Sequence, residues 1–254
     1  MAMGYSISQW NYGMYRTQLE IEDLAEEIRA GGYGIEWWPR GWGIPPLTDE
    51  HIERFAAASQ SMRVSLHSEN PVRFPYKPQI ELAVRIGAEI QVIHAGMLLG
   101  PDGDDYAGAA DMVRYAGDHG VRLALENSLN DTDVLRRLLE ANESLGFCYD
   151  VGHGYRSDPQ IDHKTFLADV FQERLCHVHL QDVLRPDELH LPGGTGADHF
   201  MIGTGIIPQE FWDALGAELQ RRDYKGLLVF ELRPRNVIQL VTRSRILLEG
   251  AWGA

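Results

Sequence analysis

Residues 121–150, VRLALENSLNDTDVLRRLLEANESLGFCYD, contain the repeating unit that decides the fold. A short apolar run, Val121 to Glu126, is followed by a stretch from Thr132 to Leu145 whose apolar positions have helical spacing. Gly146 then opens a second apolar run that ends at Asp150. Strands joined through a helix pair in parallel. This stretch therefore predicts a β–α–β unit in which both strands end on a carboxylate.

The same alternation extends over the whole chain. Strands are expected at Gly4 to Ser8, Tyr33 to Trp37, Arg63 to His67, Ile90 to His94, Val121 to Glu126, Gly146 to Asp150, Leu175 to Leu180 and Leu227 to Leu232. Helices are expected at about Gln18 to Ala30, Asp49 to Gln60, Tyr76 to Ile86, Asp105 to Asp118, Thr132 to Leu145, Gln209 to Arg222 and Val237 to Leu248. No G-x-G-x-x-G turn follows the first strand, which disfavours an open doubly wound sheet. The pattern predicts an α/β fold, a single (β/α)8 TIM barrel over residues 1–254.

The composition limits the kinds of partner. The 23 basic and 37 acidic side chains give a formal net charge of −14, which disfavours nucleic acid, although a locally basic groove stays open. Residues Met1 to Trp10 do not resemble a signal peptide, and no run approaches the roughly 18 apolar residues of a membrane span. We therefore expect a cytoplasmic protein with no membrane partner. Cys148 and Cys176 lie in apolar runs, which predicts buried thiols rather than a disulfide or a nucleophile.

Most of the expected strands end on a chargeable side chain, where a barrel normally holds apolar residues. These residues are His67, His94, Glu126, Asp150, His179 and Glu231. Strand ends of a parallel barrel meet at one rim, so the side chains should converge, and a divalent cation would relieve the repulsion among the carboxylates. Three carboxylates and one imidazole suit Mn²⁺, Co²⁺ or Mg²⁺ and also accept Zn²⁺ or Fe²⁺. The alternative is a buried ion-pair network, but basic partners are scarce at these strand ends.

Other polar and aromatic residues lie near the same rim. His177 precedes His179 by two residues and so points to the same face one layer deeper, where it either bonds a ligand or fills the core. His153 follows Asp150 by three residues, and Gly152 leaves room for the chain to turn back over the rim. Glu36 is a predicted contact for a substrate hydroxyl group. Aromatic residues that either stack on a sugar ring or pack loops together are Trp10, Trp37, Trp38, Trp42 and Phe74, and the Gly41 to Pro46 stretch indicates a lid or a partner surface.

Short motifs at the strand ends give the chain a resemblance to a known superfamily. They are Leu66-His67, Val92-Ile93-His94-Ala95-Gly96, Ala124-Leu125-Glu126-Asn127, Tyr149-Asp150-Val151-Gly152-His153, His177-Val178-His179-Leu180-Gln181-Asp182, Gly203-Thr204-Gly205 and Phe230-Glu231. In this order and spacing the chain resembles the xylose-isomerase-like barrels, which include ketose 3-epimerases, inosose dehydratases, hydroxypyruvate isomerases and apurinic-site nucleases of the endonuclease IV type.

The epimerase resemblance implies specific roles. Glu126, Asp150, His179 and Glu231 would be the metal ligands. Glu126 and Glu231 would also exchange the proton α to a carbonyl through a metal-stabilised cis-enediolate, one removing it and the other returning it from the opposite face. His153 and Arg185 would contact substrate oxygens, although Arg185 is equally compatible with a solvated loop cation.

The nuclease resemblance implies three zinc ions instead of one. The matching residues are His67, His94, Glu126, Asp150, His153, His179, His199 and Glu231. Alignment through Gly203 and Gly205 puts Ala197 where the nucleases have an aspartate, and Asp198 is one position out of register. This departure argues against the third zinc ion.

We therefore predict a divalent-metal-dependent isomerase or epimerase of a small sugar, polyol or hydroxy-carbonyl compound, with a place in carbohydrate metabolism. The alternatives are a lyase of the inosose dehydratase type, a zinc-dependent hydrolase of abasic DNA, and a non-catalytic barrel that binds a sugar. The outer residues His67, His94, His153, Arg185 and His199 are predicted to bind either substrate or further metal ions. A homo-oligomer is compatible with the sequence, which does not decide the oligomeric state.

Overall fold

The strands close into one parallel barrel. The computed structural model describes residues 4–13, 20–38, 48–68, 76–99, 109–128, 131–156, 163–184, 198–233 and 237–253. Strands pair in the order β1 to β8, with β8 returning to β1. They are β1 (Gly4–Ser8), β2 (Gly34–Trp37), β3 (Val64–His67), β4 (Ile90–Ile93), β5 (Arg122–Glu126), β6 (Gly146–Asp150), β7 (Leu175–Leu180) and β8 (Leu227–Phe230). The predicted (β/α)8 barrel is confirmed.

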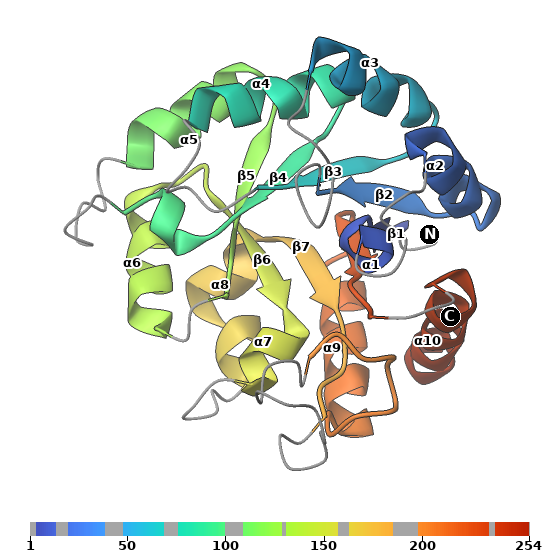
Figure 1. Ribbon diagram of the computed structural model, residues 1–254. Helices are drawn as coiled ribbons and strands as arrows, with labels where there is room; N and C mark the ends of the chain where they lie inside the picture. Colours follow the sequence, from blue (N-terminus) through green and yellow to red (C-terminus); the bar gives the residue numbers. More distant parts are fainter. Residues whose placement is uncertain are drawn as a thin grey trace, which may run out of the picture.

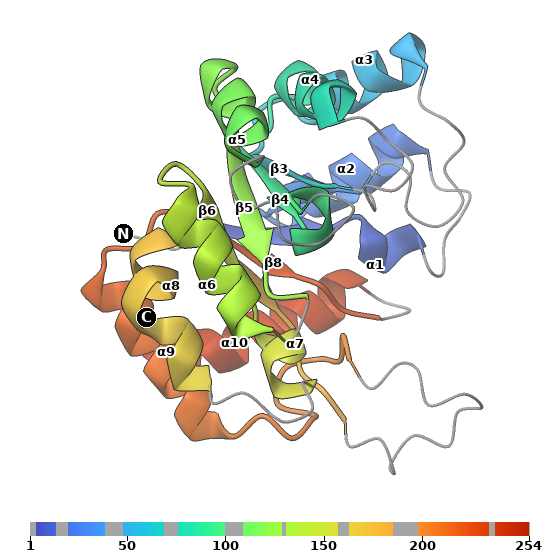
Figure 2. The same cartoon turned by 90° about the vertical axis from the view of Figure 1, so that its left-hand side faces the viewer.

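Helices surround the strands (Figures 1 and 2). The longer ones are α2 (Ile21–Ala30), α3 (Asp49–Ala58), α4 (Tyr76–Ile86), α5 (Ala109–Asp118), α6 (Thr132–Ala141), α9 (Gln209–Arg221) and α10 (Val237–Trp252). Short helical segments are α1 (Trp10–Gly13), η2 (Ala95–Met97), α7 (Val151–Arg156), η3 (His163–Leu167) and α8 (Asp169–Arg174). Within the described ranges, no helix combines the length and apolar character that a bilayer crossing requires.

Helix α6 shows how local sequence sets the element boundaries. Asp131 caps its start, where the carboxylate accepts hydrogen bonds from the backbone N–H of Asp133 and Val134, both at 3.1 Å. The predicted helix ran on to Leu145, but it ends at Ala141 because Asn142 adopts an extended backbone conformation. The Asn142 side chain instead donates to the Leu138 carbonyl at 2.9 Å. Asparagine bonds readily to nearby backbone and so favours helix ends.

Apolar side chains form two layers. A large core lies between the strands and the outer helices, and a small separate cluster consists of Ile90, Val92, Ala124, Cys148 and Cys176. Both cysteines are buried and free, as predicted. Alternate residues of a strand point to the same face, so the side chains two positions beyond Ala124 and Cys148 share their side of the barrel. The small cluster therefore forms the floor beneath the polar rim.

Candidate metal centre

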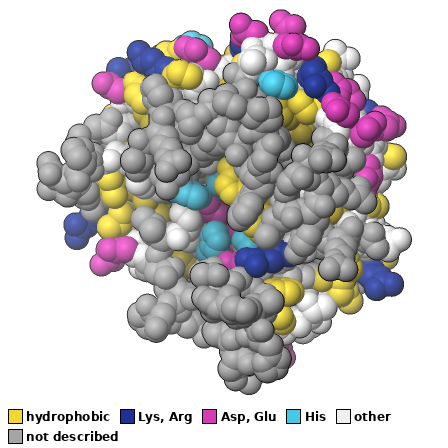
Figure 3. Space-filling view, viewed as in Figure 1, with side chains coloured by type: hydrophobic (Ala, Val, Ile, Leu, Met, Phe, Trp, Pro, Cys, Tyr) yellow, Lys and Arg dark blue, Asp and Glu magenta, His cyan; other side chains and the backbone are white. Residues whose placement is uncertain are grey.

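The four predicted metal ligands lie together at the carboxyl ends of β5 to β8. Nδ1 of His179 lies 3.2 Å from Glu126 Oε1, 3.7 Å from Asp150 Oδ2 and 3.7 Å from Glu231 Oε2. None of the four is more than 6% exposed. Figure 3 shows histidine and acidic side chains gathered in a depression in the middle of this face. The convergence expected from the strand ends is thus present in the structure.

Glu126 directs its two oxygens at different histidines. Oε2 lies 2.7 Å from His94 Nε2 and 3.5 Å from His67 Nε2. Oε1 lies 3.2 Å from His179 Nδ1 and 3.4 Å from His153 Nδ1. A carboxylate that faces two groups of imidazoles in this way has the geometry of a bridging ligand.

Several of these atoms lack the hydrogen bonds that burial normally demands. Glu126 Oε2, His153 Nδ1 and His179 Nε2 are buried, and none makes a hydrogen bond of acceptable angle within the described residues. The close approach of His94 to Glu126 is therefore a distance without a hydrogen-bond angle. Unpaired buried polar atoms are costly, and a cation would satisfy Glu126 Oε2 and His153 Nδ1, whereas His179 Nε2 faces Glu36 Oε1 at 3.2 Å. Groups whose ligand atoms all lie within 4.8 Å of one another are His67, His94 and Glu126; Glu126, Asp150 and His179; and His67, His179 and Glu231. The donor set thus fits a divalent metal.

A further group of donors includes His199, whose Nδ1 lies 3.7 Å from Glu231 Oε2. His153, Asp198 and His199 also place ligand atoms within 4.8 Å of one another. Asp198 is one residue out of register with the expected aspartate, yet it lies close enough to His153 and His199 to share an ion with them. Whether a third zinc ion binds stays a prediction.

Asp150 is held by residues that the sequence reasoning did not assign. Its backbone N–H donates to Asn127 Oδ1 at 2.6 Å, and Asn127 Nδ2 donates back to its carbonyl at 2.8 Å. Gln181 Nε2 lies 2.9 and 2.7 Å from the two Asp150 oxygens, while Gln181 Oε1 accepts from the His199 backbone at 2.6 Å. Asn127 directly follows Glu126, and Gln181 lies two residues after His179, so closeness in sequence to a predicted ligand was the available signal.

Glu36 and His177 form a polar layer beneath the rim. Glu36 Oε2 accepts from Ser65 Oγ at 2.9 Å and lies 2.8 Å from His177 Nε2, while Oε1 lies 3.2 Å from His179 Nε2. Neither Glu36 nor His177 is exposed at all. Glu36 was predicted to contact a substrate hydroxyl group, and His177 either to bond a ligand or to fill the core; a substrate contact of either residue stays a prediction. Because β2 and β7 are not neighbours, the contacts of Glu36 with His177 and His179 cross the interior of the barrel.

His153 reaches the centre from a helix rather than a turn. It lies on α7, which begins directly after β6, and its backbone N–H donates to Asp150 Oδ1 at 2.7 Å. Gly152 is required there for a different reason from the one expected. A Cβ on Gly152 would lie 2.4 Å from Cδ of Gln181, closer than van der Waals contact allows. The glycine thus lets α7 approach β7.

Aromatic residues line the rim beside the metal ligands. The Trp10 ring lies 4.2 Å from the His199 ring between centroids, and Trp38 lies 5.2 Å from His67. Arg233, which the sequence reasoning missed, forms an ion pair with Asp198 and lies over the Trp10 ring at 6.0 Å. Trp37 points away, because its Nε1 donates to Ser59 Oγ at 2.6 Å and its ring packs on Phe55.

Other predicted residues lie outside the described ranges. They are Arg185, Ala197, Trp42, Phe74 and the stretch 41–46. The long connection 181–208 is described only for residues 181–184 and 198–208.

Burial and neighbouring charges shift the two glutamates in opposite directions. Burial alone would raise the pKa of the Glu126 carboxyl, but the four neighbouring imidazoles, those of His153, His179, His67 and His94, hold it well below its ordinary range. At Glu231 burial dominates over the lowering charges of His179 and His67 and raises the pKa to about 7. In the metal-free protein Glu126 is therefore a carboxylate, whereas Glu231 titrates near neutral pH.

The pKa values of the histidines are also shifted in different directions. Burial disfavours charge on each ring, but Glu126 raises the pKa of His67 to about 9, and Asp150 together with Glu126 raises that of His153 to about 10. At His199 burial prevails and lowers the pKa to about 4. Metal ligands must be deprotonated, so an ion that binds His67 or His153 displaces a proton from it.

The fold and the buried carboxylates and imidazoles at the carboxyl ends of its strands place the chain among the parallel barrels with a candidate metal centre. The chain belongs to the xylose isomerase-like TIM barrel family, whose profile matches residues 23–251. The predicted superfamily is thereby confirmed, and its members are mostly enzymes.

Individual relatives are distant. An uncharacterized protein of Methanocaldococcus jannaschii is 25% identical over 189 residues, which cover 67% of this chain and 59% of that relative. Among solved structures, a D-tagatose 3-epimerase-like protein is 18% identical, with a TM-score of 0.68 and coverage of 99% of this chain and 97% of its own. The probable 3-DHS dehydratase involved in petrobactin synthesis from Bacillus anthracis is 13% identical, with a TM-score of 0.64 and coverage of 96% and 98%. At these identities the structures show a shared fold.

Proposed function

We propose that the protein is a divalent-metal-dependent isomerase or epimerase of a small sugar, polyol or hydroxy-carbonyl compound. The observation that carries the proposal is the pairing of Glu126 and Glu231, which approach the same nitrogen of His179 at 3.2 and 3.7 Å but have pKa values displaced in opposite directions. Moving a proton on and off carbon near neutral pH needs one group that is already a base and another that titrates near the working pH.

Glu126, Asp150, His179 and Glu231 would hold the ion. When bound, it would polarise the substrate carbonyl and so acidify the neighbouring C–H bond. Neighbouring side chains orient these ligands and set the position of their protons. Glu36 Oε1, 3.2 Å from His179 Nε2, favours a proton on that nitrogen and leaves Nδ1 free to bind the metal. Asn127 and Gln181 fix Asp150.

Proton transfer is then the work of the two glutamates. One removes the proton α to the carbonyl, the negative charge is delocalised as an enediolate, and the other returns a proton. Trp10 at the rim offers an aromatic face for the apolar side of a sugar ring. The D-tagatose 3-epimerase-like neighbour supports this reaction class, and the dehydratase neighbour supports a lyase that would begin with the same proton abstraction.

The test is solvent exchange at carbon. Metal-loaded protein incubated with Mn²⁺ and a panel of ketoses in deuterated water should replace the α-proton with deuterium, observed by proton NMR. Glu231→Gln and Glu126→Gln should abolish the exchange, while Glu210→Gln, an exposed residue at the start of α9, should exchange as the wild type does. Loss of water from an exchanged substrate would identify the lyase. If no ketose of the panel exchanged its α-proton, the result would contradict the isomerase, the epimerase and the lyase.

A second candidate, a zinc-dependent hydrolase of abasic DNA, is favoured by the division of Glu126 between two pairs of histidines and by the further donor group of His153, Asp198 and His199. Bridging carboxylates are suited to sites with more than one metal ion. Elemental analysis discriminates, because one ion per chain supports the isomerase and three zinc ions support the hydrolase. Cleavage of an abasic duplex that is abolished by chelation would establish the second activity. The net charge of −14 argues against a DNA substrate.

A further inference from the structure

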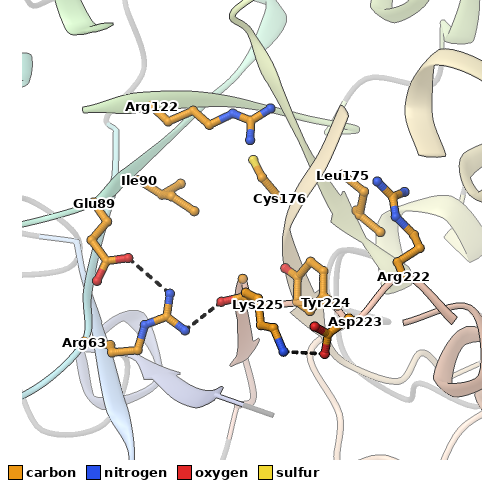
Figure 4. Close-up of a pocket in the computed structure, with 11 residues that line it drawn as sticks. Arg63, Glu89, Ile90, Arg122, Leu175, Cys176, Arg222, Asp223, Tyr224 and Lys225 are labelled. Atoms are coloured by element: carbon orange, nitrogen blue, oxygen red, sulfur yellow. Dashed lines mark hydrogen bonds and ion pairs between the residues drawn. The ribbon is translucent and has the colours of Figure 1, made fainter. Parts of the chain in front are cut away.

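A depression of about 410 Å³ lies at the opposite end of the barrel, around the amino ends of the strands. Ile90, Arg122 and Leu175, the first residues of β4, β5 and β7, line it together with the turn that precedes β8. Figure 4 shows side chains from these separate elements arranged around one space. Nothing in the proposed reaction uses this end of the molecule.

Part of the charge in this depression is already compensated. Arg63 Nη2 lies 3.1 Å from Glu89 Oε2, and Arg63 Nη1 donates to the Lys225 carbonyl at 2.9 Å. Lys225 forms an ion pair with Asp223. Two acidic groups therefore match two of the four basic groups.

Arg122 and Arg222 remain without a carboxylate partner among the described residues. In Figure 4 neither guanidinium group carries a dashed contact to the other lining residues. Arg222 makes one long bond, from Nη2 to the Glu173 carbonyl at 3.4 Å, while its Nη1 is buried and makes no hydrogen bond within the described residues. The positive charges of Arg122 and Arg222 both act to lower the pKa of the same thiol, that of Cys176 in the pocket wall. A chain with an excess of acidic residues thus holds two uncompensated guanidinium groups beside one cavity.

We propose that this basal pocket, defined by Arg122, Arg222, Cys176 and Tyr224, binds the phosphate group of a small molecule. A guanidinium group presents parallel N–H donors that match two oxygens of a phosphate, and charged hydrogen bonds of this kind are stronger than neutral ones. A phosphate dianion would supply the charge that the two arginines lack. The cavity is larger than a phosphate ion alone, and Ile90, Leu175 and Tyr224 offer apolar surface for the rest of the ligand.

Binding here is expected to be non-covalent. Burial raises the pKa of the Cys176 thiol to about 11, against the lowering influence of Arg122, so the sulfur stays protonated at neutral pH. A protonated thiol is a poor nucleophile. Cys176 therefore serves as an apolar wall of the pocket.

Isothermal titration calorimetry tests the proposal on the full-length, metal-loaded protein. Inorganic phosphate and glucose 6-phosphate are titrated separately at constant ionic strength, with sodium chloride as the reference. Saturable binding of at least one of them is expected, and the tighter of the two tells whether free or esterified phosphate is preferred. Arg122→Gln and Arg222→Gln should each weaken binding about tenfold or more, because each removes a charged bidentate contact.

Controls separate this pocket from the metal centre and from misfolding. Arg114→Gln removes an exposed arginine on α5 that pairs with Asp111, and it should bind phosphate as the wild type does. Glu231→Gln, at the opposite rim, should do the same. Arg122→Lys keeps the charge but not the fork of donors, so an intermediate affinity is expected. Absence of saturable binding, or wild-type affinity in both glutamine variants of the pocket, overturns the proposal. Neither result bears on the exchange assay, which contains no phosphate.

Discussion

Replacing Asp182 with alanine is the substitution that best tests how the rim is held together. One carboxylate oxygen of Asp182 accepts from the backbone N–H of Val183 at 2.9 Å and of Ile207 at 3.3 Å. The other accepts from Gly203 and Gly205, both at 2.9 Å. The carboxylate thus ties β7 to the returning segment that carries His199. Alanine removes all four hydrogen bonds at once.

The size of the effect follows from the surroundings of the four donors. The Val183 and Ile207 bonds are buried, and an orphaned buried N–H costs about 1–3 kcal/mol. The Gly203 and Gly205 donors are partly exposed and can bond water, so each loss costs roughly 0.5–1 kcal/mol. Burial raises the pKa of Asp182, which means that the native carboxylate is partly desolvated. Removing the carboxylate relieves this desolvation cost and so offsets part of the loss of hydrogen bonds. We therefore expect Asp182→Ala to lower the free energy of unfolding by about 3 kcal/mol, which corresponds to the lower value of each cost per hydrogen bond.

Urea unfolding followed by circular dichroism measures this loss. Asp182→Asn keeps one oxygen for the Val183 and Ile207 donors but turns an NH₂ group toward two glycine N–H groups, so an intermediate loss is expected. Asp213→Ala, on the exposed face of α9, should change stability by less than about 0.5 kcal/mol. If Asp182→Ala stays within about 0.5 kcal/mol of the wild type, the assignment of Asp182 as the tie between β7 and the His199 segment is wrong.

Three further results are expected. Gly152→Ala should destabilise the protein and weaken metal binding, because the new methyl group collides with Gln181, which holds Asp150; equal metal content and stability in wild type and variant would contradict this. In chelator, stability should fall as pH rises above about 6.5, since His153, with a pKa of about 10, and Glu231, with a pKa of about 7, both retain protons in the folded state that the unfolded chain releases earlier; below that pH the lowered pKa values of His199 and Glu126 act in the opposite direction. The His153 contribution is complete below about pH 6.5 and lost as pH passes 10, while apparent metal affinity should rise over the same range; flat unfolding energies would refute the assignment. Cys148 and Cys176 should both resist a thiol reagent in the native protein and react after denaturation, because burial raises their pKa values; rapid native labelling would show that a thiol is exposed.

The fold could be predicted because each strand is an apolar run with clear ends. The limits of β1, β6 and β7 agree with the sequence reasoning residue for residue. The short helices α7, η3 and α8 were missed. Each has six residues or fewer, too few for a helical period to repeat, and α7 begins where β6 ends.

The depth of a polar side chain within the barrel was harder to predict than its direction. The sequence indicated that Glu36 lies at the end of a strand, but not how far below the rim its side chain lies. In a barrel that depth depends on the tilt and stagger of the strands, and Glu36 lies 2.8 Å from His177 across the interior. Asp198 shows another limit, because a mismatch of one residue in the alignment did not indicate how close its carboxylate lies to His153 and His199.

Parallel pairing also puts the two proposed sites, whose side chains carry opposite charge, at opposite ends of one barrel. Every strand begins at one end and finishes at the other, so a single strand such as β5 contributes Arg122 to the basal pocket and Glu126 to the metal centre. The apolar cluster that includes Val92 and Ala124 lies between them and excludes the water that would otherwise screen and connect the two charged regions. Substitution at either end should therefore have separate consequences. Arg122→Gln should leave metal content unchanged, and Glu231→Gln should leave phosphate binding unchanged. Joint loss of both functions in either variant would mean that the floor between them does not insulate the two sites.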